Sequence, residues 1–188
     1  MKHFLLIVLP LLVLADDAQS QRCVEGNCTD GIGTLQVGNS KFVGKFTEGK
    51  LFGYGLVITD DISCEAYMID TKFDGLAHCF LPKNNYHVLQ KMKGKLNNAP
   101  QIIISSSGDI ISFDMYQGGK RIDGYFGSDS NKRSRQGQEL RNFQAQLGNL
   151  RRSAPDGIEK FVPRQLKTIP KLEVGDFESP PALRRERM

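Results

Sequence analysis

Apolar and polar side chains alternate between residues 40 and 46, where phenylalanines and a glycine are separated by lysines and a valine. This period of two is typical of a strand with one buried face. Residues 47–50 follow as a turn, in which Gly49 is free to adopt a positive φ. Residues 54–59 are rich in residue types that favour strands. The whole segment therefore predicts a β-hairpin.

Small residues recur with a period of 22 positions. The recurring pairs are Gly31 with Gly33, Gly53 with Gly55, and Gly75 with Ala77. A period of this length is typical of stacked supersecondary units. Glycine also recurs too often for the interior of a helix. We therefore expect residues 21–127 to form a mainly β domain, a meander of stacked β-hairpins in a single sheet.

The second half of this domain contains less regular segments. Residues 86–96 place apolar side chains at helical spacing between a proline and two asparagines, which predicts a short helical insertion with a basic outer face. Residues 101–106 and 110–116 are then expected to be two strands joined by a Ser-Gly-Asp turn at 107–109.

The composition changes after residue 127. Residues 128–152 are expected to be a linker and one amphipathic helix. Its apolar face consists of Leu140, Phe143, Leu147 and Leu150. Residues 153–188 contain five prolines, alternating charges and few aromatic residues, so this segment predicts a disordered basic tail.

One hairpin resembles a known family. The pattern Phe42-x-Gly44-x-Phe46-x-x-Gly49-x-x-x-Gly53-x-Gly55 is similar to a MORN (membrane occupation and recognition nexus) repeat. Residues 26–33 resemble the second half of another repeat, and the following unit departs from the pattern at Ala66, Thr71 and Ala77. The resemblance covers residues 23–80, with a looser echo at 110–127. It implies a scaffold or protein-binding surface. The phosphoinositide binding proposed for the family would not suit an exported chain, because those head groups lie on the cytosolic leaflet.

The first twenty residues predict a signal peptide. A basic start precedes an apolar run at 4–14, and small residues follow, with cleavage expected after either Ala15 or Ser20. The run is shorter than the roughly 20 residues that a spanning helix needs. A buried N-terminal helix and a membrane anchor are the alternative interpretations. We expect a secreted, extracellular protein without a membrane span.

The mature chain contains four cysteines, an even number that suggests disulfides in an exported protein. The hairpin register places Cys64 opposite Cys79, within reach of a bridge. We therefore predict the pairs Cys64–Cys79 and Cys23–Cys28, with a crossed pairing between units as the alternative. Asn27-Cys28-Thr29 is also an N-glycosylation acceptor sequence, which predicts a glycan at Asn27 on an exposed loop.

The charge distribution argues against a nucleic-acid reader. Residues 21–127 hold eleven basic and eleven acidic side chains, whereas residues 128–188 hold thirteen basic and eight acidic ones, a net charge of +5. The basic character therefore belongs to the C-terminal segment and not to the folded domain, where a nucleic-acid footprint would lie.

No catalytic pattern is present in the sequence. The mature chain has two histidines, His78 and His87, and neither has zinc-binding spacing with a cysteine or a second histidine. His78 and Cys79 are adjacent, and adjacent strand residues point to opposite faces. The sequence has no Gly-x-Ser-x-Gly elbow and no phosphate-binding glycine loop. We expect no enzyme activity, no metal and no cofactor.

The aromatic residues suggest a binding role. Phe42 and Phe46 are expected in the core, whereas Phe52, Tyr54 and Tyr67 are the candidate binding residues, with core packing as the alternative. The sequence thus predicts a secreted, non-enzymatic module that binds an extracellular protein partner. The sequence does not determine the oligomeric state.

The alternative function is a secreted precursor. Its tail would be cleaved into peptides at three dibasic pairs, Lys132-Arg133, Arg151-Arg152 and Arg184-Arg185. Basic pairs are also ordinary in solvated tails, so the pattern by itself does not distinguish the two functions.

Overall fold

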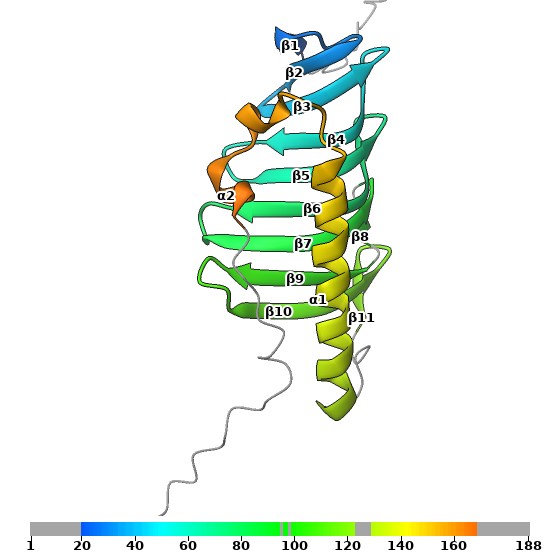
Figure 1. Ribbon diagram of the computed structural model, residues 1–188, viewed down its shortest axis with the longest axis vertical. Coiled ribbons are helices and arrows are strands. Elements are labelled where there is room, and N and C mark those ends of the chain that lie inside the picture. The colour runs from blue at the N-terminus through cyan, green and yellow to red at the C-terminus, as the bar shows by residue number, and fades with distance from the viewer. Residues whose placement is uncertain (1–19, 95, 98, 123–128, 169–188) are drawn as a thin grey trace, which may run out of the picture.

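The computed structural model describes residues 20–94, 96–97, 99–122 and 129–168. The predicted signal peptide falls almost entirely on residues 1–19 and therefore lies outside the described residues, as do residues 169–188 of the predicted tail. Eleven strands of the described part form one antiparallel sheet, in which neighbours in the chain are neighbours in space (Figure 1). This arrangement confirms the predicted mainly β meander of hairpins.

The strands follow one another closely along the chain. They are β1 (Gln21–Gly26), β2 (Gly31–Val37), β3 (Ser40–Thr47), β4 (Lys50–Ile58), β5 (Ser63–Ile69), β6 (Lys72–Leu81), β7 (Tyr86–Lys93), β8 (Leu96–Asn97), β9 (Pro100–Ser105), β10 (Ile110–Gln117) and β11 (Lys120–Ile122). The order across the sheet matches this sequence, except that β8 pairs only with β7 and lies off the main path.

Two hairpins bend at the same point in their strands. In the β3–β4 pair, Gly44 faces Gly55 and Phe46 faces Leu51, so Lys45 is opposed by the three residues 52–54. The β5–β6 pair repeats this bulge 22 residues later, between its Ala66 and Met68 partners. Gly53 and Gly75 occupy equivalent bulge positions and have φ of 80° and 117°, which an L side chain rarely adopts. Bulges bend a strand, so the hairpin tips turn to one side of the sheet.

The hairpin tips stack on one another. The amide of Gly49 donates to the carbonyl of Thr29 at 3.0 Å, that of Thr71 to Leu51 at 3.0 Å, and that of Gly94 to Phe73 at 2.7 Å. The three acceptors are spaced by 22 residues, so the sequence period is the repeat of this stack. Thr71 replaces the turn glycine yet keeps a positive φ of 59°, and its hydroxyl accepts the Leu51 amide at 3.0 Å.

A row of small residues lies beneath these tips. Across five neighbouring strands the register aligns Gly33, Gly44, Gly55, Ala66 and Ala77. A Cβ at Gly55 would lie 2.6 Å from Cδ2 of Leu51 and 2.9 Å from Cγ of Met68. Small residues are therefore needed for Leu51 and Met68 to fold back onto the sheet. We call this side, with its own buried core, the tip face.

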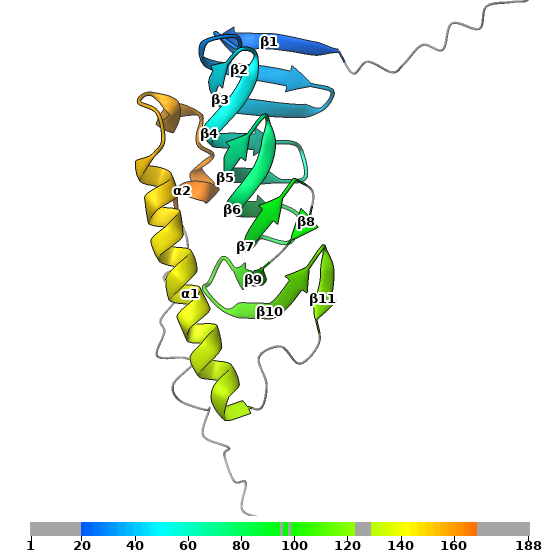
Figure 2. The same cartoon turned by 90° about the vertical axis from the view of Figure 1, so that its right-hand side faces the viewer.

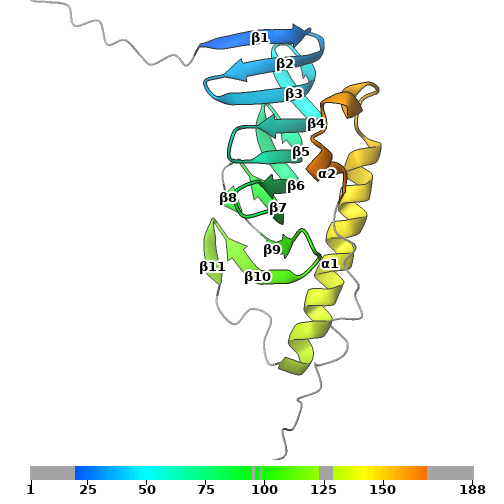
Figure 3. The same ribbon diagram turned by 90° about the vertical axis from the view of Figure 1, so that its left-hand side faces the viewer.

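The opposite side of the sheet is covered by helices, and we call it the helix face. Helix α1 (Asp129–Arg152) runs across the strands in Figure 1, and Figures 2 and 3 show it on the side away from the hairpin tips. Its four predicted apolar residues, Leu140, Phe143, Leu147 and Leu150, are all buried in one cluster with residues of the sheet. The amphipathic helix was therefore predicted correctly.

The predicted helical insertion at 86–96 is wrong. Residues 86–93 form strand β7 in the interior of the sheet, between β6 and β9. Three consecutive residues, His87, Val88 and Leu89, are buried because both faces of the sheet are covered at this point. A strand buried on both faces loses its two-residue alternation, so spacing alone did not distinguish it from a helix.

The predicted disorder from Ser153 is wrong as far as residue 168. A short 3-10 helix, η1 (Ile158–Phe161), and α2 (Arg164–Lys167) follow α1 and pack on the helix face. Ile158 and Leu166 are 1% and 0% exposed. These two apolar residues hold the segment on the sheet. The prolines and charges around them led to the prediction of disorder.

Candidate functional site

Two ionisable residues lie in the middle of an apolar row on the helix face. The register aligns Val43, Leu56, Glu65, His78 and Leu89 across five strands. Glu65 is 1% exposed and His78 is not exposed at all. A charged group buried to this extent is costly unless it is paired and hydrogen-bonded, so its partners define the site.

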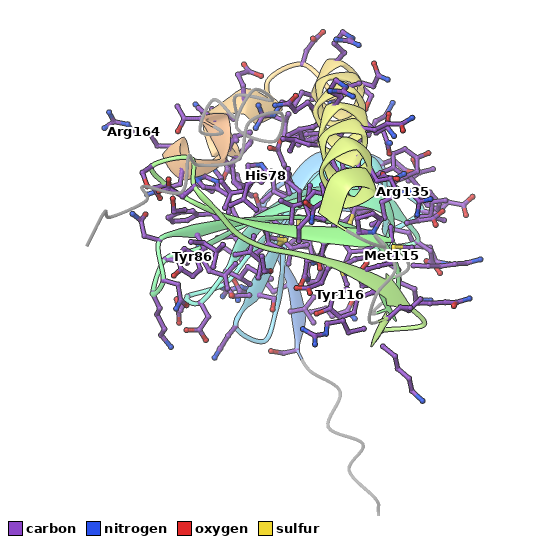
Figure 4. All side chains as sticks on the ribbon, turned by 90° about the horizontal axis from the view of Figure 1, so that it is seen from below. His78, Tyr86, Met115, Tyr116, Arg135 and Arg164 are labelled. Carbon is purple, nitrogen blue, oxygen red and sulfur yellow. A yellow bond between two sulfur atoms is a disulfide. The ribbon has the colours of Figure 1, made fainter. Side chains whose placement is uncertain are left out.

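Glu65 and His78 belong to a chain of hydrogen bonds on the sheet. His78 Nδ1 lies 2.7 Å from Glu65 Oε1, and its Nε2 lies 3.0 Å from Nδ1 of His87. The Tyr54 hydroxyl donates to Glu65 Oε2 at 3.0 Å. Figure 4 shows His78 on the side of the sheet that faces the helices. Strands β4 to β7 thus supply one contiguous polar cluster.

Arg151, near the end of α1, completes the cluster from above. Its Nε lies 3.1 Å from each oxygen of Glu65, and its Nη2 lies 2.5 Å from Oε1. Nη2 also donates to the carbonyl oxygen of Leu166 in α2. One guanidinium therefore connects α1, α2 and β5, and 34% of its side chain remains exposed.

The environment fixes the protonation of three members of the cluster. Burial alone would raise the pKa of Glu65, but hydrogen bonds and charge from His78 and Arg151 outweigh it and lower the pKa overall. Burial, with the Glu65 carboxylate beside it, raises the pKa of Tyr54. Burial and the charge of His78 lower the pKa of His87 to about 4. At neutral pH the cluster therefore holds a carboxylate, a phenol and a neutral His87.

The cluster presents no reactive lone pair to solvent. The two Glu65 oxygens accept from Tyr54, His78 and Arg151, and both histidine rings are almost completely buried. A general base must reach the proton that it takes. The arrangement is therefore suited to holding the Arg151 guanidinium in a fixed position.

A surface pocket of about 430 Å³ opens over this cluster. Tyr54, Glu65 and Arg151 line one part of it, and the segment after α1 supplies the remaining wall, which includes the apolar Ile158, Val162 and Leu166. Among the described residues, no group of three or more histidines, cysteines and acidic residues could hold a metal ion. No helix in that part of the chain is long and apolar enough to cross a membrane.

The three predicted binding residues have different environments. Phe52 and Tyr67 are 41% and 42% exposed, whereas Tyr54 is 3% exposed and bonds to Glu65. Tyr54 therefore belongs to the buried cluster and is not a surface anchor, because it lies on the part of the helix face that the end of α1 and the following segment cover. Tyr67 lies directly opposite Tyr54 in the β4–β5 register and borders a second surface hollow together with Asn149 and Leu150 of α1.

The exposed residues form a surface patch next to Tyr54. The β4–β5 register pairs Tyr54 with Tyr67 and Gly53 with Met68. Its continuation by one residue sets Phe52 opposite Ile69, which is 41% exposed. We call Phe52, Tyr67 and Ile69 the exposed apolar patch. It lies where β4 and β5 bend toward the tips.

The structure contains the two disulfides expected from the sequence, Cys23–Cys28 and Cys64–Cys79, and no free cysteine among the described residues. Cys64 and Cys79 are direct cross-strand partners, as the hairpin register required. Asn27, the predicted glycan site, is exposed, and its Oδ1 accepts the amides of Thr29 and Asp30 at 2.9 Å. Two disulfides are consistent with an oxidising, extracellular setting.

Two of the three dibasic pairs lie in α1. Lys132-Arg133 is in its first part, and Arg151-Arg152 ends it. Arg184-Arg185 lies outside the described residues.

The polar cluster was not predicted from the sequence, although one signal was present. The register that places Cys64 opposite Cys79 also places Glu65 opposite His78. The contribution of Arg151 depends on helix packing and has no such local signal. Comparison with protein-family models and with curated proteins finds no match to this chain, so the geometry of the cluster and of the patch is the basis for a functional interpretation.

Proposed function

We propose that this chain is a secreted, non-enzymatic binding module that holds an extracellular protein partner on the exposed apolar patch of a MORN-like hairpin array. The observation that carries the proposal is the exposure of Phe52, Tyr67 and Ile69 at one site. Aromatic side chains at a surface are frequent anchors of protein interfaces. A group of exposed apolar side chains also marks an interaction surface more often than scattered ones do.

The strands beneath the patch are held in place, so a partner could bind without a large rearrangement of this chain. The patch lies on β4 and β5, which have paired strands on both sides. Thr71 in the next turn also bonds to the Leu51 backbone, immediately before Phe52. An interface residue that is already ordered loses less conformational entropy on binding, so the same contacts give higher affinity.

Catalysis is less well supported than binding. The most perturbed ionisable groups are those of the Glu65 cluster, and perturbed groups are often functional. Here the carboxylate is saturated by its own neighbours and the histidines are buried. These contacts favour a role in holding α1 and Arg151 in place.

The precursor alternative keeps one supporting observation, the dibasic pairs. Convertases need an accessible extended segment, whereas Arg151-Arg152 ends a helix and Arg151 is bound to Glu65. The intact mass of the natural secreted protein separates the two functions. A mass that corresponds to cleavage after Arg133 or Arg152 would favour the precursor.

The binding proposal is tested by capture with matched variants. The full chain is immobilised as wild type, as Phe52→Ser/Tyr67→Ser, and as Ile111→Ser, and each is exposed to extracellular fluid of the source. Ile111 on β10 is 50% exposed and lies outside the patch, so it controls for loss of an exposed apolar side chain.

The expected result is a protein that is retained by the wild type and by Ile111→Ser but lost with the double variant. Equal thermal unfolding of the three chains shows that the fold is intact. Equal retention by all three, or retention by none, would contradict the proposal.

A further inference from the structure

We propose that the pocket beside Arg151 is a binding site for a small molecule with an apolar body and a single carboxylate. This site is distinct from the exposed apolar patch and does not depend on the protein-binding function. The inference rests on the unused side of the Arg151 guanidinium, on the buried residues that fix it, and on the apolar wall formed after α1.

The polar group that the pocket offers to a ligand is a donor. Nε and Nη2 of Arg151 are occupied by Glu65 and by the Leu166 carbonyl. Nη1 makes no hydrogen bond with any described residue, although Arg151 lines the pocket and is 34% exposed. Glu65 is 1% exposed, and its oxygens are already bonded to three residues. A ligand therefore meets N–H donors and needs an acceptor.

The cluster below Arg151 prepares it for such a ligand. An isolated arginine has a long, flexible side chain that loses entropy when it binds. Here Glu65 fixes the guanidinium, and His78 and Tyr54 fix Glu65 in turn. Because these contacts already exist in the free protein, the ordering cost of binding is reduced.

The walls indicate an apolar body of modest size. Ile158, Val162 and Leu166 give the pocket an apolar side, and its volume of about 430 Å³ is of the size that small-molecule sites have. Lys167 adds a positive charge at the pocket, whereas Asp156 and Glu159 add negative ones. With Glu65 and Arg151 included, the lining holds three acidic and two basic side chains, so a negative group is accommodated only at the free donor of Arg151 and near Lys167. A second negative charge, as in a phosphate or a dicarboxylate, would be repelled by the acidic side chains.

The test uses three probes of equal chain length, namely decanoate, decanol and decylammonium, below the concentrations at which they form micelles. Binding to the full chain is followed by NMR of the methyl groups of Ile158, Val162 and Leu166. We expect decanoate to shift these methyls and to bind about tenfold more tightly than decanol, because a charge-assisted hydrogen bond contributes on this scale. Decylammonium is expected to bind most weakly. Equal binding of the three, or tightest binding of decylammonium, would overturn the proposal.

Two pocket variants test whether decanoate binds in this pocket. Val162→Trp adds bulk to the apolar wall of the pocket and leaves Glu65 and Arg151 unsubstituted, and it is expected to weaken decanoate binding at least about tenfold. Lys167→Glu changes an exposed charge and should weaken decanoate severalfold while leaving decanol unchanged. Phe52→Ser, in the exposed apolar patch, is the control that should bind decanoate as the wild type does. Unchanged decanoate affinity in both pocket variants would show that the fatty acid binds elsewhere.

Discussion

The tip face and the helix face of the same sheet are closed in different ways. On the tip face, each hairpin folds its own end back onto a row of small residues, and the contact from Thr71 to Leu51 spans 20 positions. On the helix face, the cover comes from α1, and the ion pair from Arg151 to Glu65 spans 86 positions. One face is therefore built by local contacts that repeat, and the other depends on a single distant element.

This difference predicts different behaviour under perturbation. Local hairpins close short loops, whereas docking a distant helix closes a long one and must overcome more chain entropy. Proteins also open in cooperative units, and units held by few specific contacts open first. We therefore expect α1 and the segment after it to detach before the stacked hairpins separate.

Glu65→Gln is expected to have the largest effect. The substitution removes the carboxylate that pairs with Arg151 and accepts from His78 and Tyr54, and breaking one partner of a buried pair costs about 3–5 kcal/mol of unfolding free energy. Urea unfolding measures the loss. The control is Asp70→Asn, because Asp70 pairs with Lys50 and Lys72 at the surface and should cause no measurable change. Equal stability of Glu65→Gln and the wild type would contradict a specific role for the pair.

Removing the Cys64–Cys79 disulfide tests the other face. Cys64→Ala/Cys79→Ala opens a loop of 15 residues on the tip face and should cost about 3 kcal/mol in the chain-entropy model. Cys23→Ala/Cys28→Ala opens a shorter loop of 5 residues at the exposed edge strand and should cost less. Thermal or urea unfolding measures the stability of both variants. A larger loss of stability in Cys23→Ala/Cys28→Ala would contradict the expectation that the disulfide closing the longer loop stabilises more.

Mild acidification should weaken the helix face. Burial lowers the pKa of His87 from 6.5 to about 4, so between these values the unfolded chain binds a proton that the folded chain does not. Stability therefore falls as the pH drops from 6.5 to about 4, by about 1–3 kcal/mol, and this contribution levels off below. The pKa of Glu65 is lowered too, and the stability it contributes above its unfolded pKa is lost as the pH falls through its folded pKa. His87→Gln should flatten the curve between pH 6.5 and 4, whereas an unchanged curve would exclude His87 as the cause.

Gly55→Ala acts on the tip face and should have a smaller effect than the loss of Glu65 or of the Cys64–Cys79 disulfide. Its Cβ would lie 2.6 Å from Cδ2 of Leu51, which is completely buried, so overpacking should cost about 1–3 kcal/mol. Gly53→Ala is the matched comparison, since nothing lies within 4 Å of its Cβ but its φ is 80°. That backbone conformation costs an L residue about 1–2 kcal/mol. In a Leu51→Ala background, the cost of Gly55→Ala should therefore fall, whereas the cost of Gly53→Ala should stay the same. Urea unfolding of the single and double variants measures both costs.

The local features of the tip face could be predicted from the sequence. The repeat of small residues indicated the hairpins, and the register within a hairpin placed Cys64 opposite Cys79, because both depend on residues close together in the chain. The same register contained the Glu65–His78 pair, which was missed because a lone acidic residue in a strand is usually read as a solvated side chain.

The parts that could not be predicted depend on what covers each segment. Strand β7 lacks alternation because both of its faces are buried. The position of Arg151 over Glu65 follows from how α1 lies on the sheet, which its amphipathic pattern does not determine. Ile158 and Leu166 are buried only because α1 brings the next segment back to the sheet. In each case the missing information is a contact between residues far apart in the chain.

Hydrogen exchange of the wild type and of Glu65→Gln tests the central claim most directly, namely that the two faces are closed independently. In the variant, we expect amide protection to fall in α1 and around Leu166, while the stacked-turn amides of Gly49 and Thr71 keep their protection. Loss of protection at Gly49 and Thr71 to the same extent as in α1 would show that the sheet and its helical cover open as one unit, and would contradict this account.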